Sequence, residues 1–149
     1  MSRMYLLLCV ALLTCGCQSL ERDAVVRPLP EGQSFGYQEL LGRARLQATA
    51  GLEAFYVDAW SELQDVAVSL EQTARLLPKA ARVPDAVKDR VGPETDLLRQ
   101  DAIKLGEAAR AKDARAVNDA LQRINLRIRD LRVPEKSPAS IPANDNPLP

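Results

Sequence analysis

Histidine is absent from the 149-residue chain, and sulfur-containing residues are confined to its first 17 positions. The three cysteines are Cys9, Cys15 and Cys17, and the two methionines are Met1 and Met4. Zinc, copper, iron–sulfur and ordinary haem sites depend on these side chains, and a Ser-His-Asp triad needs histidine. We therefore expect the remainder of the chain to bind no metal and no cofactor, and not to be an enzyme.

An excess of charge is also missing, because 20 Lys and Arg residues balance 20 Asp and Glu residues. Nucleic-acid binders usually carry a basic excess, so we expect no nucleic-acid partner. Hydrophobic residues make up 46% of the chain and charged residues 27%, which is typical of a folded chain rather than a disordered one. The length allows one domain.

The first 16 residues have the features of an export signal. Arg3 supplies a positive charge, and residues 5–14 form an apolar run that is too short for a spanning helix, which needs about 20 residues. The sequence Thr-Cys-Gly-Cys follows at positions 14–17. This segment resembles the lipobox of bacterial lipoproteins, in which a signal peptidase cuts before a cysteine that is preceded by a small residue.

The resemblance implies that residues 1–16 are removed as a signal peptide and that Cys17 carries a diacylglycerol and acyl chains such as palmitate. Thr14 departs from the aliphatic residue that the family prefers three positions before the cysteine. Cys15 is the alternative site, and a plain secretory signal is the alternative to lipidation. Gln18, in place of the Asp that favours inner-membrane retention, implies an anchor in the outer membrane, facing the periplasm.

Two proline-containing segments flank the middle of the chain. Residues 17–36 contain Pro28, Pro30 and Gly32 without an apolar period, and they predict a flexible tether behind the lipidated cysteine. Residues 134–149 contain five prolines and predict a disordered tail. The folded region should therefore comprise residues 37–133.

Apolar residues recur at spacings of three and four from residue 37 to residue 77, which predicts one helix of about forty residues ended by Pro78. They are Tyr37, Leu41, Ala44, Ala48, Leu52, Phe55, Ala59, Leu63, Val66, Leu70, Ala74 and Leu77. A break near Gly51 is the alternative, because glycine destabilises a helix by up to about 1 kcal/mol.

Two further helices follow the first. The second begins near Pro84, and Gly92-Pro93 predicts a kink or a restart within it. The third begins after an N-cap at Asp113. Their apolar faces are Val87, Val91, Leu98, Ala102, Leu105 and Ala109, and then Val117, Leu121, Ile124, Ile128 and Leu131.

Short connections make consecutive helices antiparallel. The pattern therefore predicts an all-α fold, an antiparallel helical bundle of three helices, or of four if the first is broken near Gly51. Its core, rich in Leu, Ala and Val, is of the kind found in packed bundles and coiled coils.

Two groups of charged residues are candidate sites. Asp58, Glu62 and Asp65 form an acidic stripe, which is either a cation site or, more commonly, a solvated helix face. The last helix carries five arginines that either contact an anionic lipid or envelope polymer or pair within the bundle; they are Arg115, Arg123, Arg127, Arg129 and Arg132. Asn118 and Asn125 either set the register of a helix interface or are exposed.

The densest aromatic group is Phe55, Tyr56 and Trp60. Phe55 lies on the apolar face, and Tyr56 and Trp60, four residues apart, are expected to widen it. Large side chains that anchor a core are the common reason for such a group. A ligand pocket between helices is the alternative.

The segment Leu-Gly-Glu-Ala-Ala-Arg-Ala-Lys-Asp at residues 105–113, followed by Ala120, Leu121 and Ile124, resembles the C-terminal half of periplasmic four-helix c-type cytochromes. In that family a Cys-x-x-Cys-His haem site ends the last helix. The matching residues 128–132 contain neither Cys nor His. The resemblance therefore implies a haem-less bundle without electron transfer.

These features together predict a membrane-anchored envelope lipoprotein with a non-enzymatic structural or protein-interaction role. Its partners would be the membrane, through the lipid anchor, and a second copy of the chain or another protein. The alternative is a helical module that binds a small ligand or a lipid in a pocket near Trp60.

Overall fold

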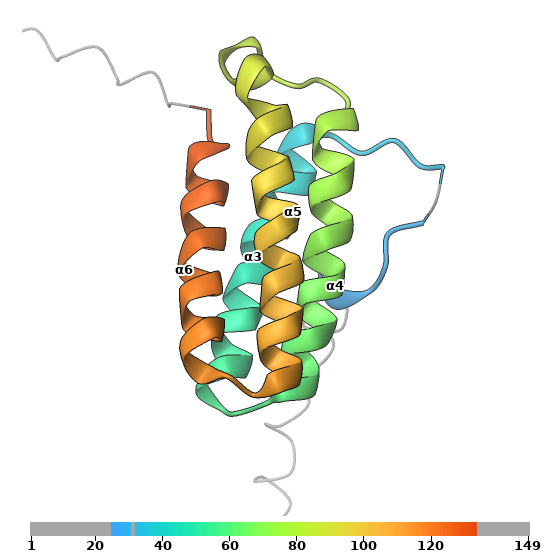
Figure 1. Cartoon of the computed structure of the whole chain (residues 1–149). Helices are drawn as coiled ribbons and strands as arrows, with labels where there is room; N and C mark the ends of the chain where they lie inside the picture. Colours follow the sequence, from blue (N-terminus) through green and yellow to red (C-terminus); the bar gives the residue numbers. More distant parts are fainter. Residues whose placement is uncertain (1–24, 31, 134–149) are drawn as a thin grey trace, which may run out of the picture.

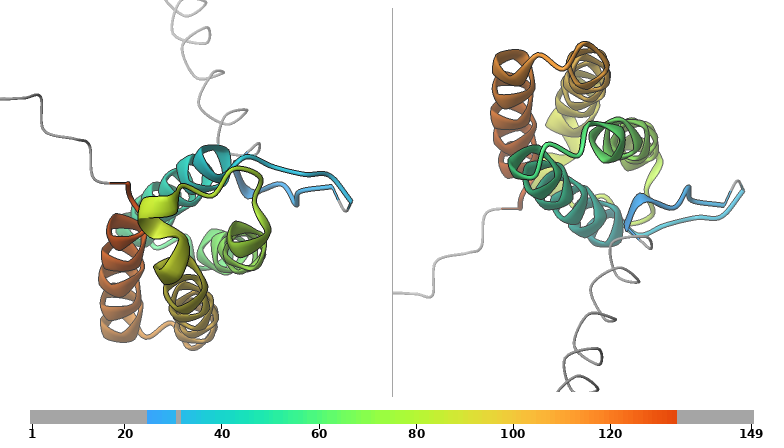
Figure 2. Two further views of the ribbon diagram at one scale, coloured as in Figure 1. Left: turned by 90° about the horizontal axis from the view of Figure 1, so that it is seen from above. Right: turned by 90° about the horizontal axis from the view of Figure 1, so that it is seen from below.

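The computed structural model describes residues 25–30 and 32–133, which form a bundle of four α-helices (Figure 1). The helices are α3 (Tyr37–Tyr56), α4 (Trp60–Leu76), α5 (Lys88–Ala111) and α6 (Ala114–Asp130). Consecutive helices run in opposite directions and pack on each other, and α6 closes the ring by packing on α3 (Figure 2). The predicted all-α antiparallel bundle is confirmed, in its four-helix form.

The apolar faces predicted for the second and third segments form the core. All eleven positions from Val87 to Leu131 that the pattern assigned to these faces are buried. Alanine and leucine are both present in the core, and Ala44 on α3 and Ala102 and Ala109 on α5 are as fully buried as the leucines. Alanine lets neighbouring helices approach, and leucine fills the space between them.

The prediction of one helix of about forty residues is wrong, because the chain turns between α3 and α4 at residues 57–59. Asp58 has a left-handed backbone with φ of 55°. The N–H of Ala59 donates to the carbonyl of Ala54 (2.9 Å) and the N–H of Asp58 donates to that of Phe55 (3.2 Å), which is the Schellman arrangement. Lys112 ends α5 in the same way, with φ of 54°. Neither position is glycine, the usual signal for this motif, so the sequence pattern missed the turn.

Gly51 does not break α3 but lies inside it, at a point where the helix approaches α4 and α6 closely. A Cβ atom added there would lie 3.2 Å from Cδ2 of Leu121 on α6 and 3.3 Å from Cγ1 of Val66 on α4. Both of these side chains are buried. The glycine therefore serves close packing of three helices rather than a turn.

Gly51→Ala should lower the free energy of unfolding by about 1–3 kcal/mol, the usual cost of overpacking a core. Gly42→Ala is the matched control in the same helix, because a Cβ atom there meets nothing within 4 Å. That control should raise stability by up to about 1 kcal/mol, through helix propensity alone. Urea unfolding of both variants measures the difference, and an equal gain at the two positions would contradict this view of the packing.

Of the kink or restart predicted at residues 92–93, the restart does not occur, since α5 continues through Pro93. The proline lies in the second turn, so its missing N–H removes a single backbone hydrogen bond. The hydroxyl of Thr95, a buried residue, lies 2.6 Å from the carbonyl oxygen of Val91 and 2.9 Å from that of Gly92, so it finds its acceptors within α5. Asp113 caps α6 as predicted, with its carboxylate accepting from the N–H of Ala116 (3.0 Å).

Residues 25–30 and 32–36, which the sequence assigned to a flexible tether, are called the strap here (blue to pale blue in Figure 1). Both ends of the strap contact the bundle, and the loop between them projects away from the helices (Figure 2). Gln72 on α4 holds the strap with two hydrogen bonds: its Oε1 accepts from the N–H of Leu29 (3.0 Å), and its Nε2 donates to the carbonyl of Leu29 (3.2 Å). Gln47 on α3 donates to the carbonyl of Val25 (3.2 Å). The prediction of a free tether is wrong for these residues.

The strap enters the core at its C-terminal end. Phe35 is buried, and its carbonyl accepts from the N–H of Ala81 (2.8 Å) in the connection between α4 and α5. The carbonyl of Ala81 in turn accepts from the N–H of Tyr37 (3.0 Å). The proline content of residues 25–36 did not reveal these contacts, because the groups that hold the strap belong to α3, α4 and the connection between α4 and α5, which are distant in the sequence. The predictions for residues 1–24 and 134–149 lie outside the described residues.

Candidate functional site

Among the aromatic residues, Phe55 and Trp60 pack together, and Tyr56 does not join the core. The rings of Phe55 and Trp60 meet edge to face with centroids 6.4 Å apart, and both side chains are partly buried against the core. Tyr56 is 77% exposed, so the expectation that it widens the apolar face was wrong. It lies at the end of α3, directly before the turn.

The acidic stripe is not one helix face. Asp58 lies in the turn between α3 and α4, and only Glu62 and Asp65 lie on α4, where both are exposed. Among the described residues, no group of three or more acidic side chains is placed to hold a metal ion. Asn118 and Asn125 are both exposed, so they do not set the register of a core interface.

Two of the five arginines of the last helix pair with acids on α5. Nε of Arg123 lies 2.7 Å from Oδ1 of Asp101, and Nη1 of Arg127 lies 3.4 Å from Oε2 of Glu94. Nε of Arg127 is also 3.8 Å from Oδ2 of Asp101. Asp101 is only 4% exposed, and a buried carboxylate is tolerated only when cations compensate it. These two arginines therefore have a structural role.

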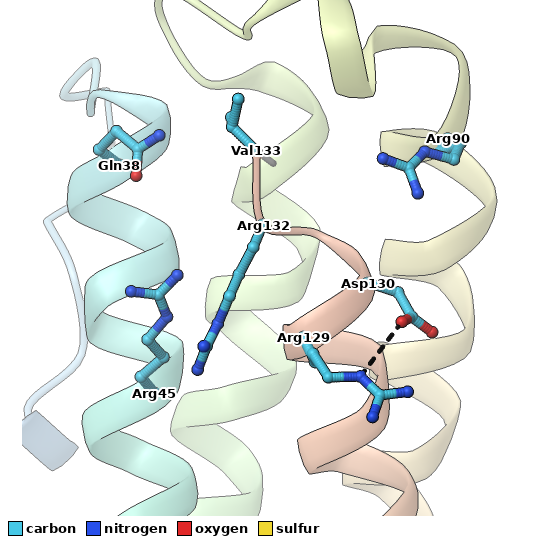
Figure 3. Close-up of a pocket in the computed structure, with 7 residues that line it drawn as sticks. All are labelled: Gln38, Arg45, Arg90, Arg129, Asp130, Arg132 and Val133. Carbon is cyan, nitrogen blue, oxygen red and sulfur yellow. Dashed lines mark ion pairs between the residues drawn. The ribbon is translucent and has the colours of Figure 1, made fainter. Parts of the chain in front are cut away.

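The arginines at the end of α6 belong to a different site, which Figure 3 shows. Arg129 and Arg132 line an open groove of about 720 Å³ together with Arg45 from α3 and Arg90 from α5. In Figure 3, Arg45 and Arg132 lie between α3 and the end of α6, and Arg90 and Arg129 lie on the other side of Arg132. We call this set the arginine groove. One carboxylate, that of Asp130, also lines it, with Oδ1 3.6 Å from Nε of Arg129. Four guanidinium groups thus share the groove with a single negative charge.

Tyr37 fixes the wall of the groove. Its buried hydroxyl donates to the carbonyl of Leu131 (2.6 Å), which ties the start of α3 to the end of α6. Burial raises the pKa of this hydroxyl above its ordinary value, and the charges of Arg90 and Arg45 oppose the rise. The hydroxyl therefore stays protonated at neutral pH and keeps its hydrogen bond. Both guanidinium groups also lie within electrostatic reach of this one hydroxyl.

Two further cavities lie between neighbouring helices, and the charged side chains that line them are of both signs. One of about 220 Å³ lies beside Ala67 and Gly106, between α4 and α5. The other, of about 470 Å³, lies beside Ala108 and Asp119, between α5 and α6. Acidic and basic side chains line both of them, so neither gathers one kind of charge as the arginine groove does.

Comparison of the chain with protein-family models, curated proteins and solved structures found no match. The resemblances to lipoproteins and to haem-less cytochromes thus stay predictions from the sequence. Within residues 25–30 and 32–133, no helix combines the length and the apolar character that crossing a membrane requires. Cys17 lies outside the described residues, eight positions before the first residue of the strap.

Sequence reasoning found half of the arginine groove and missed the rest. Arg129 and Arg132 belong to the predicted arginine cluster of the last helix. Arg45 and Arg90 come from other helices and have no pattern of their own that would connect them to this cluster. A prediction that the starts of α3 and α5 meet the end of α6 at one end of an antiparallel bundle would have brought all four together.

Proposed function

We propose that this chain is a lipid-anchored, non-enzymatic protein of the bacterial envelope whose helical bundle acts by binding a partner. The observation that carries the binding role is the gathering of four guanidinium groups in one groove. Guanidinium groups donate hydrogen bonds and keep their charge at any physiological pH, but they do not transfer protons. The groove therefore suits recognition of an anionic partner rather than acid–base chemistry.

The strap supports the anchoring part of the proposal. Hydrogen bonds from Gln47 and Gln72 hold residues 25–29 against α3 and α4, so the bundle is attached close to the proposed anchor. Val25 is eight positions after Cys17, and this stretch spans at most about 29 Å when fully extended. A lipid on Cys17 would thus keep the bundle next to the membrane surface, on the periplasmic face of the outer membrane as Gln18 implies.

Lipidation at Cys17 is tested by metabolic labelling with a fatty-acid analogue. The native chain should become labelled and fractionate with membranes, because one cysteine carrying several acyl chains anchors a protein stably. Cys17→Ala should abolish labelling and release the protein from membranes. Cys15→Ala is the matched control two residues away and should leave both unchanged. Labelling that persists in Cys17→Ala and disappears in Cys15→Ala would move the site to Cys15. A native chain that does not become labelled would reject the anchor.

A pocket for a lipid or another small apolar ligand near Trp60 is the second candidate. The observation that favours it is the exposed ring of Tyr56, with its centroid 6.2 Å from that of Phe55 at the end of the bundle. The partly buried Trp60 lies beside the same phenylalanine. Titration with lipid, followed by the fluorescence of Trp60, the sole tryptophan, separates this candidate from binding at the arginine groove, which lies at the opposite end.

A further inference from the structure

The arginine groove holds positive charge that the described part of the protein does not neutralise. Among the described residues, Arg45, Arg90 and Arg132 form no ion pair, whereas Arg123 and Arg127 lie next to acids on α5. Nε of Arg45 is buried and has no hydrogen-bond partner there. The chain as a whole has a formal charge of zero, so the excess arises from how the helices are arranged. A groove of this kind attracts anions.

The position of Arg90 is unfavourable for the bundle alone. It is the third residue of α5, at the helix end where the backbone dipole is positive and where acidic side chains are stabilising. Gln38, the second residue of α3, lines the same groove and brings an amide that can donate a hydrogen bond. A bound anion would reverse the repulsion at Arg90 and provide acceptors for these donors.

The geometry of the donors points to phosphate as the anion. Guanidinium groups are planar forks that bind phosphate oxygens through pairs of charge-assisted hydrogen bonds. Several arginines from different helices can surround one tetrahedral group, and in Figure 3 the side chains of Arg45 and Arg132 both lie between α3 and the end of α6. The volume of about 720 Å³ is in the range of small-ligand sites, so the phosphate would be part of a larger group.

We propose that the arginine groove binds the phosphate of an anionic phospholipid headgroup in the membrane that holds the protein. The lipid source rests on the proposed function, because an anchor on Cys17 confines the bundle to the membrane surface. Gln47, which holds the strap at Val25, is two residues beyond Arg45 on α3. Positions two residues apart face different sides of a helix, so the strap and the groove lie on opposite sides of α3 (Figure 3). A helix with its side chains is about 10–12 Å wide, and the stretch from Cys17 to Val25 can span up to about 29 Å, so the anchor can reach the membrane surface that the groove faces. Confinement raises the local concentration of headgroups, so a modest affinity is enough for occupancy.

The test uses the full chain with vesicles of phosphatidylcholine alone, or of equal parts phosphatidylcholine and phosphatidylglycerol. A ligand that binds only the folded state raises the midpoint of thermal unfolding, and we expect a rise of about 4 °C or more with phosphatidylglycerol. Arg45→Gln/Arg132→Gln should lose this rise. Arg110→Gln/Arg115→Gln removes the same charge from exposed positions away from the groove and should keep it. Far-ultraviolet circular dichroism follows the unfolding.

Arg90→Gln is the second variant, in case the double substitution does not fold. Its side chain is exposed at the start of α5, so it should fold as well as the native chain, and its phosphatidylglycerol-dependent rise should be reduced. A rise that survives in the groove variants, or that falls equally in Arg110→Gln/Arg115→Gln, would overturn the groove as the site. Inorganic phosphate added to phosphatidylcholine vesicles tests the source. If it raises the midpoint where phosphatidylglycerol does not, the ligand is a soluble phosphate and the lipid proposal fails.

Different results would reject the proposed anchor and the proposed headgroup site. Flotation of the native chain with pure phosphatidylcholine vesicles depends on the acyl chains and not on the groove. Its loss in Cys17→Ala supports the anchor. In that variant the phosphatidylglycerol-dependent rise in midpoint should shrink and should return at higher vesicle concentration, because the anchor no longer confines the bundle to the headgroups. Flotation without any response to phosphatidylglycerol would leave the anchor in place and reject the groove as a headgroup site.

Discussion

Leu121→Ala should lower the free energy of unfolding by about 2–5 kcal/mol, the range measured when a buried leucine is truncated in a tight core. Leu121 is 2% exposed in the middle of α6, and its Cδ2 atom faces the surface of α3 at Gly51. Truncation would leave a cavity where three helices meet. Leu63, Leu70 and Ile124 have the same degree of burial and should respond in the same range.

Gln122→Ala is the control for this core substitution. It lies next to Leu121 on α6 but is exposed, so it should change stability by less than about 0.5 kcal/mol. Urea unfolding of the full chain, followed by circular dichroism, measures both effects. Similar losses at Leu121 and Gln122 would contradict the bundle and would indicate helices that do not share one core.

Arg123→Ala/Arg127→Ala should destabilise the protein by about 3–5 kcal/mol, the usual result of leaving a buried charge without a partner. Asp101 has 6% of its side chain exposed, and these two arginines are the cations within 4 Å of it among the described residues. The sequence left open whether these arginines contact an anionic polymer or pair within the bundle. The structure decides for pairing at Arg123 and Arg127, because the buried carboxylate on α5 needs their positive charge.

Two further variants identify the cause of this loss. Arg115→Ala removes an exposed arginine from the same helix and should change stability by less than about 0.5 kcal/mol. Asp101→Asn removes the buried charge, so the same double arginine substitution should cost less in that background. Thermal and urea unfolding measure all the combinations. An unchanged cost in the Asp101→Asn background would show that packing of the arginine stems, and not charge, is responsible.

Much of the fold could be predicted from the sequence because helix faces are periodic. The spacing of Val117, Leu121, Ile124 and Ile128 identified residues that are all buried in α6. Asp113 was recognised as the cap because its side chain acts on residues three positions away. Local chemistry of this kind can be read directly from neighbouring positions.

The errors occurred where contacts distant in sequence decide the structure. The turn between α3 and α4 uses Asp58 in a left-handed conformation, and Gly51, which has the better local signal, serves the contact with Leu121 and Val66. The strap looked free because glutamines on α3 and α4, and not its own residues, supply the hydrogen bonds that hold it. The residues that pack against Gly51 and the glutamines that hold the strap are distant in the sequence, so no local pattern at Gly51 or in the strap indicates these contacts.

The sequence by itself determined the helical class, the buried faces and the absence of His, and it predicts the lipid anchor at Cys17. These properties follow from composition, from a period of three to four residues and from short motifs. Only the tertiary structure decided which arginines act together. The arrangement of helices pairs Arg123 and Arg127 with Asp101 and gathers Arg129 and Arg132 with arginines from α3 and α5. The physical reason is that electrostatic interactions depend on distances in space, and helix packing sets these distances.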